Sequence, residues 1–472
     1  MGLVHRSVSE AFVSSACAWE STTLWVLPAP PLRLLAPMKL LLIAACFLAP
    51  VQERRPFPPL PPVADDPSFG AGIQRTLTLL ATSTPQQRNS VRVLFYGQSI
   101  TEQDWWKQVA DDLRRRFPNA DLRIENKAVG GFASQLLSRI AEHDIPAFYP
   151  DLVIFHVYGG NNQYEEILRL IRTRTTAEIL MQRDHVTKWP VEHPEQKDPM
   201  WWDHMMNDVF LPDLAKKYGC GLADVRGHWL AYLKANSLEP KALLKDDVHL
   251  NDHGCFVMAE IVKRYLVYKP ALLTEAAKAS VQTLPLGKDL KVEFEGNRVD
   301  LVGGKAPQVL IDGKPPSEFP ECIAFTRTSL SQSFWGPALL RVSSAKPRVI
   351  EDWTLKVLEV DEKAEHIRFA VTGSVTGPDG EGVSAERFES TSGRVVIEPG
   401  DWWIKKVQDM TKKTIPPGFE IKWKATLLAA DPSTVVQGLP PGKHVLELPG
   451  AEGVRAVRVY KPETFEAAPQ KK

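Results

Sequence analysis

The sequence predicts an α/β domain, with a parallel sheet between two layers of helices, followed by an all-β region. Between about 71 and 269, short apolar runs alternate with helical patterns, which is typical of right-handed βαβ crossovers and a three-layer sandwich. From about 280 to 462, segments rich in Val, Ile and Thr follow one another, separated by turn signals such as "DGK" and "PPGK". This second pattern predicts one or two β-sandwich modules.

Five apolar runs supply the expected strands of the parallel sheet. They are "VRVLFY" (91–96), "LRIEN" (122–126), "LVIFHVY" (152–158), "AEILMQ" (177–182) and "GLADV" (221–225). The third run is nearly continuous in apolar residues, as expected of a parallel strand that is buried on both faces. Helical stripes separate the runs, and the last helix is expected over about 254–266.

The β-rich part begins where the pattern changes after Lys269. Strands are expected in segments such as "DWTLKVLEV", "HIRFAVTG" and "GRVVIEPGDWWI", the last of which carries Trp402 and Trp403. The stretch "GPDGEG" is expected to be a turn. We therefore expect a leader over 1–50, a Pro-rich linker over 51–70, an α/β domain over 71–269 and a β-rich accessory region over 270–472.

The N-terminal region has the pattern of a secretory signal. Met38 and Lys39 precede the apolar run "LLLIAACFLA", which is too short to span a bilayer. We expect Met38 to be the true start and the protein to be exported to the periplasm or the extracellular space. Cleavage near Ala49 and lipid attachment through Cys46 are the two alternatives for its processing.

The composition argues against several classes of partner. Over 472 residues, Lys+Arg and Asp+Glu are both 57, so no basic surface for nucleic acid or an anionic membrane is indicated. The five cysteines form no CxxC and no Cys/His pattern with zinc spacing, so we expect no metal and no other cofactor. A Cys220–Cys255 bridge and the oligomeric state stay open.

Polar or small residues follow each of the first three expected strands. Ser99 of "FYGQSIT" stands where the first strand gives way to a helix, Gly131 of "NKAVGG" follows the second strand, and Asn161 of "YGGNNQY" follows the third. Ligands bind at this carboxyl edge of parallel sheets, and helix N-termini and amide side chains suit a developing oxyanion. Taken alone, each stretch is also typical of an ordinary helix cap or turn.

The stretch "DDVHLNDHG" lies between the fifth strand and the last helix. Its Asp246 and His249 are three residues apart, so the carboxylate can hold Nδ1–H of the imidazole while Nε2 faces a serine. Asp247 is a less suitable partner, because its spacing to His249 is one residue shorter. The order serine, aspartate, histidine therefore predicts a nucleophilic serine site.

The four stretches together resemble the ordered motif blocks of SGNH/GDSL-type hydrolases from about Val91 to Leu266. The resemblance implies a flavodoxin-like α/β/α sandwich with a five-stranded parallel sheet. It also implies a catalytic triad of Ser99, Asp246 and His249. The implied oxyanion hole is made by the amides of Ser99 and Gly131 and the side chain of Asn161.

Two positions depart from the usual pattern of that family. Gln98 stands where "GDS" has aspartate, and Asn162 stands where "GxND" has aspartate. The resulting "GQS" is similar to that of some carbohydrate O-acetylesterases. The further residues expected to line the substrate site are Gln98, Asn162, His185, Trp201 and Trp202.

The expected function is that of a secreted serine esterase that hydrolyses short acyl esters, with acetyl groups on carbohydrate as the favoured substrate. Two alternatives remain. One is a lipid, thioester or aryl-ester hydrolase of the same fold. The other is a non-catalytic glycan-binding surface protein, which an intact set of Ser99, Asp246 and His249 argues against.

Overall fold

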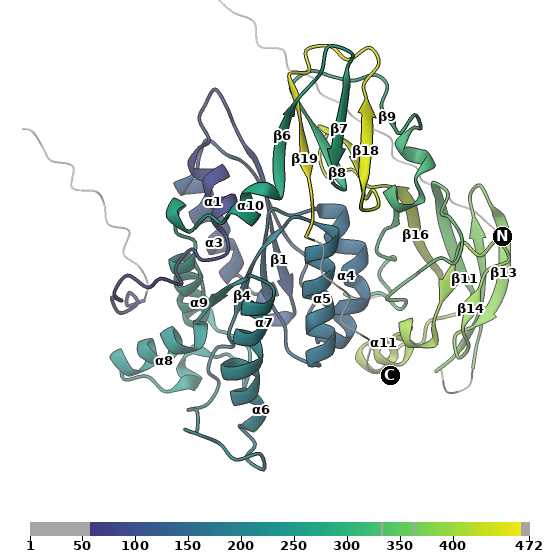
Figure 1. Cartoon of the computed structure of the whole chain (residues 1–472). Helices are drawn as coiled ribbons and strands as arrows, with labels where there is room; N and C mark the ends of the chain where they lie inside the picture. The colour runs from purple at the N-terminus through teal and green to yellow at the C-terminus, as the bar shows by residue number, and fades with distance from the viewer. Residues whose placement is uncertain (1–56, 332–333, 362, 364, 464–472) are drawn as a thin grey trace, which may run out of the picture. The chain divides into compact units, whose positions relative to one another are not determined.

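The computed structural model describes residues 57–331, 334–361, 363 and 365–463. The predicted leader, with Cys46, lies outside the described residues, and so does the first part of the Pro-rich linker. Figure 1 shows the α/β part in purple to teal and the β-rich part in green to yellow.

A five-stranded parallel sheet forms the centre of the α/β part. Its strands are β1 (Ser90–Gly97), β2 (Asp121–Asn126), β3 (Leu152–His156), β4 (Glu178–Gln182) and β5 (Gly221–Ala223). They are hydrogen-bonded in the order β2-β1-β3-β4-β5, which is the flavodoxin-like order. The fold class predicted from the sequence is confirmed, and each expected strand lies within two residues of its predicted bounds.

Helices cover both faces of this sheet, as Figure 1 shows. The first face carries α1 (Gln74–Ala81), α3 (Trp105–Arg116), α8 (Val225–Ala235) and α9 (Asp252–Tyr265), and the second carries α4 (Ser134–Phe148), α5 (Asn161–Arg174) and α7 (Leu211–Lys217). Val93 and Phe95 of β1 are buried against the first layer, and Leu94 and Tyr96 against the second. This division follows from the alternation of side chains along a strand. Shorter elements complete this part: α2 (Ser99–Glu102), α6 (Trp201–His204), the π-helical η1 (Met205–Phe210), η2 (Pro240–Leu243), η3 (Pro270–Leu272) and α10 (Glu275–Ala279).

The β-rich part contains two modules, one inserted into the other. The outer module is built from β6 (Val281–Pro285), β7 (Lys291–Glu295), β8 (Arg298–Val302), β9 (Leu310–Ile311), β17 (Thr434–Gln437), β18 (Lys443–Glu447) and β19 (Ala456–Tyr460). These strands form antiparallel sheets in the orders β17-β8-β19-β6 and β7-β18-β9. Val299, Leu446 and Val457 are buried in the core of this module.

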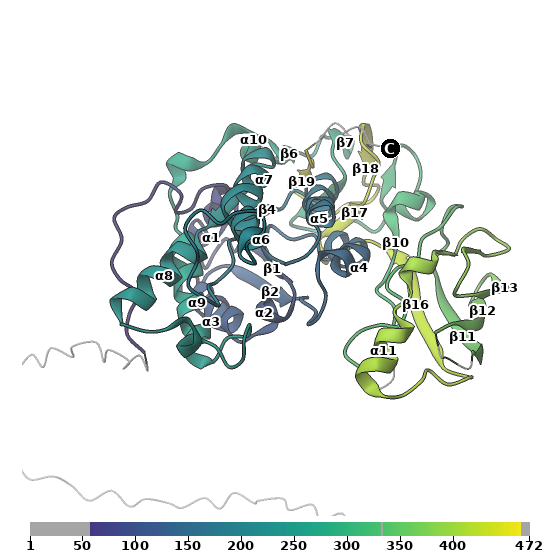
Figure 2. The same ribbon diagram turned by 90° about the horizontal axis from the view of Figure 1, so that it is seen from below.

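The inner module occupies the chain between β9 and β17. Its main antiparallel sheet has the order β10-β16-β11-β12-β13. The elements are η4 (Pro316–Glu318), η5 (Pro320–Cys322), β10 (Ile323–Phe325), β11 (Glu351–Val360), β12 (Ile367–Gly373), β13 (Gly377–Val383), β14 (Phe388–Glu389), β15 (Val396–Ile397), η6 (Pro399–Asp401), α11 (Ile404–Thr411) and β16 (Glu420–Leu427). Helix α11 lies beside this sheet in Figure 2, and its Ile404 and Val407 are buried in the core of the module.

Two local expectations for the inner module are wrong. The stretch "GPDGEG", expected as a turn, forms most of strand β13, which pairs with β12. In "GRVVIEPGDWWI", only Val396–Ile397 is a strand, because Pro399 lacks the N–H that a sheet ladder needs and begins a short helix instead. Trp402 and Trp403 therefore lie between η6 and α11, with both rings half-buried.

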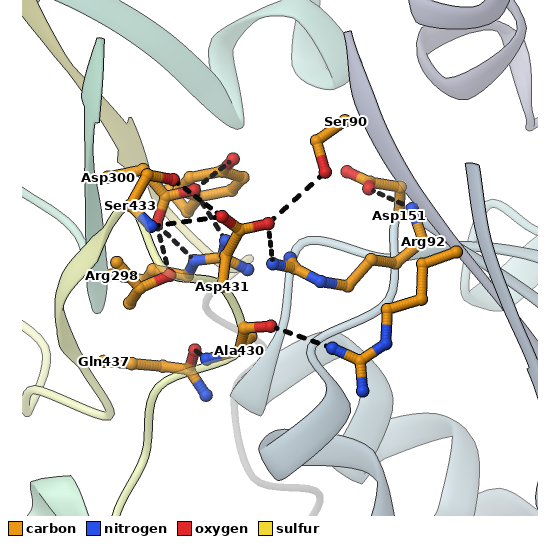
Figure 3. Close-up of polar contacts among 12 residues, drawn as sticks. Ser90, Arg92, Asp151, Arg298, Asp300, Ala430, Asp431, Ser433 and Gln437 are labelled. Carbon is orange, nitrogen blue, oxygen red and sulfur yellow. Dashed lines mark hydrogen bonds and ion pairs between the residues drawn. The ribbon is translucent and has the colours of Figure 1, made fainter. Parts of the chain in front are cut away.

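Direct contacts join both β modules to the α/β domain. On the outer module, Asp431 pairs with Arg92 at 2.7 Å (Figure 3), and only 4% of the Arg92 side chain is exposed. The Arg298 guanidinium lies over the rings of Tyr149 and Tyr460, at 4.7 and 4.5 Å from their centroids. A buried charge that loses its partner is costly, so these contacts couple the stability of the two parts.

The inner module makes its own contacts with helix α4 and the core beneath it. Arg327 forms an ion pair with the buried carboxylate of Asp144, which also accepts a hydrogen bond from Tyr96 at 3.0 Å. Arg139 pairs with the buried Asp401. Leu340 is buried among the side chains of the second helical layer. The inner module thus completes part of the α/β core.

Candidate active site

Ser99 is held at the carboxyl end of β1 by a tight turn. The carbonyl of Gln98 accepts hydrogen bonds from the amides of Thr101 and Glu102 at 2.8 and 3.1 Å, which starts α2 at Ser99. Gly97 is required just before this turn, because a Cβ there would lie 2.0 Å from the carbonyl oxygen of His156. The ends of β1 and β3 therefore approach closely beneath the serine.

The histidine loop (residues 244–251) carries Asp246 and His249. Oδ1 of Asp246 accepts hydrogen bonds from the amides of Val248 and His249 at 2.8 and 2.7 Å, while Oδ2 lies 2.9 Å from Nδ1 of His249. These bonds, first those from the two backbone amides, hold the pKa of Asp246 well below its usual range. The carboxylate is thus ionised and fixed toward the imidazole.

His249 joins the histidine loop to Ser99. Its Nε2 lies 2.9 Å from Oγ of Ser99, so a continuous chain of hydrogen bonds runs from Asp246 to the serine. The side chains of Asp246 and His249 are 50% and 35% exposed, which leaves the site open to solvent. Asp246 rather than Asp247 contacts the imidazole, as its spacing predicts.

Gln103 and His185 hold the histidine loop in place through hydrogen bonds to its backbone. The sequence did not predict either contact. The Gln103 side chain bonds Leu250 twice: Nε2 donates to its carbonyl at 2.7 Å, and Oε1 accepts from its amide at 2.9 Å. Gln103 directly follows α2, so this clamp ties the loop to the helix that begins with Ser99. No spacing rule in the sequence points to the pair.

His185 is the second holding residue, and it was expected to line the substrate site. Its ring is buried, and Nε2 lies 2.8 Å from the carbonyl oxygen of Val248. Burial lowers the pKa of His185 to about 4, so the ring is neutral at pH 7 and donates Nε2–H to that carbonyl. The structure places His185 beneath the histidine loop.

The glycine loop (residues 127–134) lies next to Ser99. A Cβ built on Gly130 would be 3.7 Å from Cβ of Ser99, so Gly130 packs against the serine. The amide of Phe132 donates to the carbonyl of Val129 at 3.1 Å, and Gly131 between them has φ +79°. These are the marks of a type II turn, in which the third residue needs a positive φ.

Asn161 lies at the same edge of the sheet. It is the first residue of α5 and is exposed, as is Asn162 after it. Ser134 fixes the chain before them, because its amide donates to the carbonyl of Tyr158 and its hydroxyl to that of Gly160, both at 2.8 Å. Among the described contacts, none joins the Asn161 amide to Ser99.

The remaining expected site residues differ in exposure. Gln98 is buried, Trp201 is half-buried, and Trp202 is exposed with its ring 6.3 Å from that of Tyr158. These positions leave Trp202 as the accessible ring of the Trp201-Trp202 pair.

Metal ligands, cysteines and long apolar helices are the other features that could point to a bound group or a membrane. Within the described ranges, no three His, Cys, Asp or Glu side chains are grouped as a metal site would need. Cys220, Cys255 and Cys322 are free thiols, so the open Cys220–Cys255 bridge is not formed. In the same described part of the chain, every helix is too short or too polar to cross a bilayer.

Comparisons with known proteins find similarity at the level of solved structures. No family model matches the chain, and no curated protein matches it. Similar structures include LAE5, an alpha/beta hydrolase enzyme from the metagenome of Lake Arreo, at 19% identity and a TM-score of 0.32, covering 39% of this chain and 98% of that one. Axe2, an acetylxylan esterase from Geobacillus stearothermophilus, is 18% identical with a TM-score of 0.33, over 40% of this chain and 98% of Axe2. A putative GDSL-like lipase from Parabacteroides merdae ATCC 43184 is 16% identical with a TM-score of 0.33, over 38% and 98%.

Proposed function

We propose that this chain is a serine esterase of the SGNH/GDSL type. The observation that carries the proposal is the hydrogen-bonded chain from Asp246 through His249 to Ser99, at 2.9 Å for each step to the imidazole. A serine beside a general base that is itself oriented by a carboxylate is the arrangement that activates a hydroxyl for acyl transfer.

In the proposed mechanism, Nε2 of His249 takes the proton of Ser99 while Oγ attacks the ester carbonyl. The ionised Asp246 keeps Nδ1–H of His249 in place and stabilises the imidazolium that forms. The imidazolium then gives its proton to the departing alcohol, which leaves an acyl-enzyme on Ser99. Water, activated by the same histidine, attacks this intermediate and releases the carboxylic acid.

The tetrahedral oxyanion needs donors that are in place before the reaction. We assign this role to the backbone amides of Ser99 and Gly131 and to the side chain of Asn161. The glycine loop packs against the serine, and Asn161 begins a helix at the same edge, which supports the assignment. Loss of one such donor costs about 10²–10³ in turnover.

A small acyl group on a large hydroxylated alcohol is the substrate we favour. The "GQS" sequence and the polar, Trp-bearing segment at 184–204 support it, as does the solvent exposure of Asp246 and His249. Export of the chain would place it with such a substrate and is part of the proposal. A lipid esterase needs a deep apolar channel for its acyl chain, and it is the alternative that the next experiment separates.

Aryl acetate should be hydrolysed at least tenfold faster than aryl octanoate, measured as kcat/KM with p-nitrophenyl esters of increasing chain length. An open site gains nothing from the six extra methylenes, whereas a channel would gain up to about 0.8 kcal/mol for each one it buries. The rate of acetate release from O-acetylated glycans, compared with that from glycerol triacetate, shows whether the enzyme prefers a carbohydrate as the alcohol part of the ester. A preference for octanoate would instead identify a lipid esterase.

Gln103→Ala should lower kcat by about 10- to 100-fold while leaving KM for aryl acetate unchanged. Without the two bonds to Leu250, the histidine loop no longer holds His249 at hydrogen-bond distance from Ser99. A displacement of about 1 Å can cost 10²-fold in rate. Gln86→Ala, an exposed glutamine before β1, is the matched control. A rise in KM with unchanged kcat would show that Gln103 acts on substrate binding instead.

A further inference from the structure

An indole of the inner β module is hydrogen-bonded to the backbone of the glycine loop. Nε1 of Trp335 donates a hydrogen bond to the carbonyl oxygen of Gly130 at 2.8 Å. Gly130 is the residue that packs against Ser99, and its carbonyl belongs to the same peptide group as the amide of Gly131. A residue of the β-rich region therefore contacts the peptide to which the proposed function gives an oxyanion donor.

This peptide is the part of the turn that can rotate. Type I and type II turns differ by a flip of their central peptide, and two adjacent glycines remove the steric barrier that would otherwise choose between them. The φ of +79° at Gly131 shows the type II state. Because the C=O and N–H of a trans peptide point in opposite directions, a bond that fixes the carbonyl of Gly130 also fixes the amide of Gly131.

The indole is itself held in place by a row of aromatic rings. Trp335 packs on Phe334 with ring centroids 4.2 Å apart, Phe334 contacts Trp403 at 5.5 Å, and Trp403 meets Phe132 edge-on at 4.6 Å. Phe132 ends the glycine turn, so the row begins and ends at the same turn. Trp335 itself is 46% exposed, so the aromatic row and the hydrogen bond to Gly130 hold its ring.

We infer that Trp335 is a positioning residue for ester hydrolysis: it locks the Gly130–Gly131 peptide in the orientation in which the Gly131 amide serves as oxyanion donor. This inference rests on the proposed function. The indole N–H acts through the peptide and touches no substrate atom. It would also polarise the peptide, which strengthens the hydrogen bond that the Gly131 amide can give.

The test is Trp335→Phe, which keeps a ring on Phe334 and removes only the N–H donor. We expect kcat for p-nitrophenyl acetate to fall about tenfold at unchanged KM, which is less than the 10²–10³ that loss of a donor itself costs. The affinity for methylboronic acid, which forms a tetrahedral adduct with an active-site serine, should fall by the same factor. Trp402→Phe is the matched control, since it makes the same change in the same module at an indole that packs on Phe369, with ring centroids 5.2 Å apart.

Each outcome separates the inference from the proposed function. If the wild-type chain neither hydrolyses the aryl ester nor binds the boronic acid, the proposed function fails and the inference fails with it. If the wild type is active and Trp335→Phe matches it, the inference alone is overturned. If Trp335→Phe is normal but Trp335→Ala raises KM only for acetylated oligosaccharides, the indole is a surface for the sugar, which also overturns it. Thermal unfolding of each variant confirms that it is folded.

Discussion

Ser99→Ala should reduce hydrolysis of aryl acetate by at least about 10⁴-fold, because the hydroxyl is the proposed attacking group and nothing else replaces it. The midpoint of thermal unfolding should hardly change, since Ser99 is half-exposed and its Oγ contributes one hydrogen bond, to His249. Steady-state rates and a thermal melt on the same preparation check both expectations.

Ser138→Ala provides the matched control for this experiment. Ser138 is half-buried on α4, and its hydroxyl makes only a long bond to the carbonyl of Gln135 at 3.5 Å. Its variant should keep wild-type activity. Activity of Ser99→Ala within tenfold of wild type would remove the serine from the mechanism and with it the proposed function.

Asp246→Asn should cost up to about 10⁴-fold in kcat, the size of loss seen when the orienting carboxylate of a serine triad is replaced by an amide. The amide can present N–H to Nδ1 of His249, which favours the tautomer with its proton on the nitrogen that faces Ser99. That tautomer cannot accept the serine proton. The pH–rate profile of the variant, compared with that of the wild type, measures the change in the base.

Asp247→Asn is the control for Asp246→Asn because it makes the same change one residue away. Asp247 is exposed and Asp246 holds the imidazole, so Asp247→Asn should stay within about twofold of wild type. If Asp247→Asn were the more damaging variant, the partner of His249 in solution would differ from the one in the structure.

The α/β part could be predicted because its signals are local. A run such as Leu152–His156 is apolar enough to specify a buried parallel strand by itself, and the chain direction then brings the following loops to one edge. Strand β13 gave no such signal. Gly382 suits a strand there because the ring of Phe388 occupies the space beside it, only 2.6 Å from where a Cβ would be.

The same distinction separates the parts of the candidate site. Ser99, Asp246 and His249 lie in ordered motifs, and the structure brings them within hydrogen-bond distance. Gln103 and Trp335 act on backbone groups that lie 147 and 205 residues away along the chain. Every residue has the same backbone groups, so the sequence does not show which of them a distant side chain will bond. No pattern could therefore have paired these side chains with Leu250 and Gly130.

The strands of the outer β module come from two parts of the chain, one before and one after the inner module. This division sets the order in which its contacts can form during synthesis. A chain emerges from the ribosome N-terminus first, and the residues that form the parallel sheet and its helices are complete well before β17–β19 appear. Until then, Arg92 lacks the carboxylate that Asp431 supplies (Figure 3), and Tyr149 lacks the edge-on ring of Tyr460. The nascent α/β domain therefore exposes a charged and aromatic surface until the last strands of the chain have been synthesised and cover it.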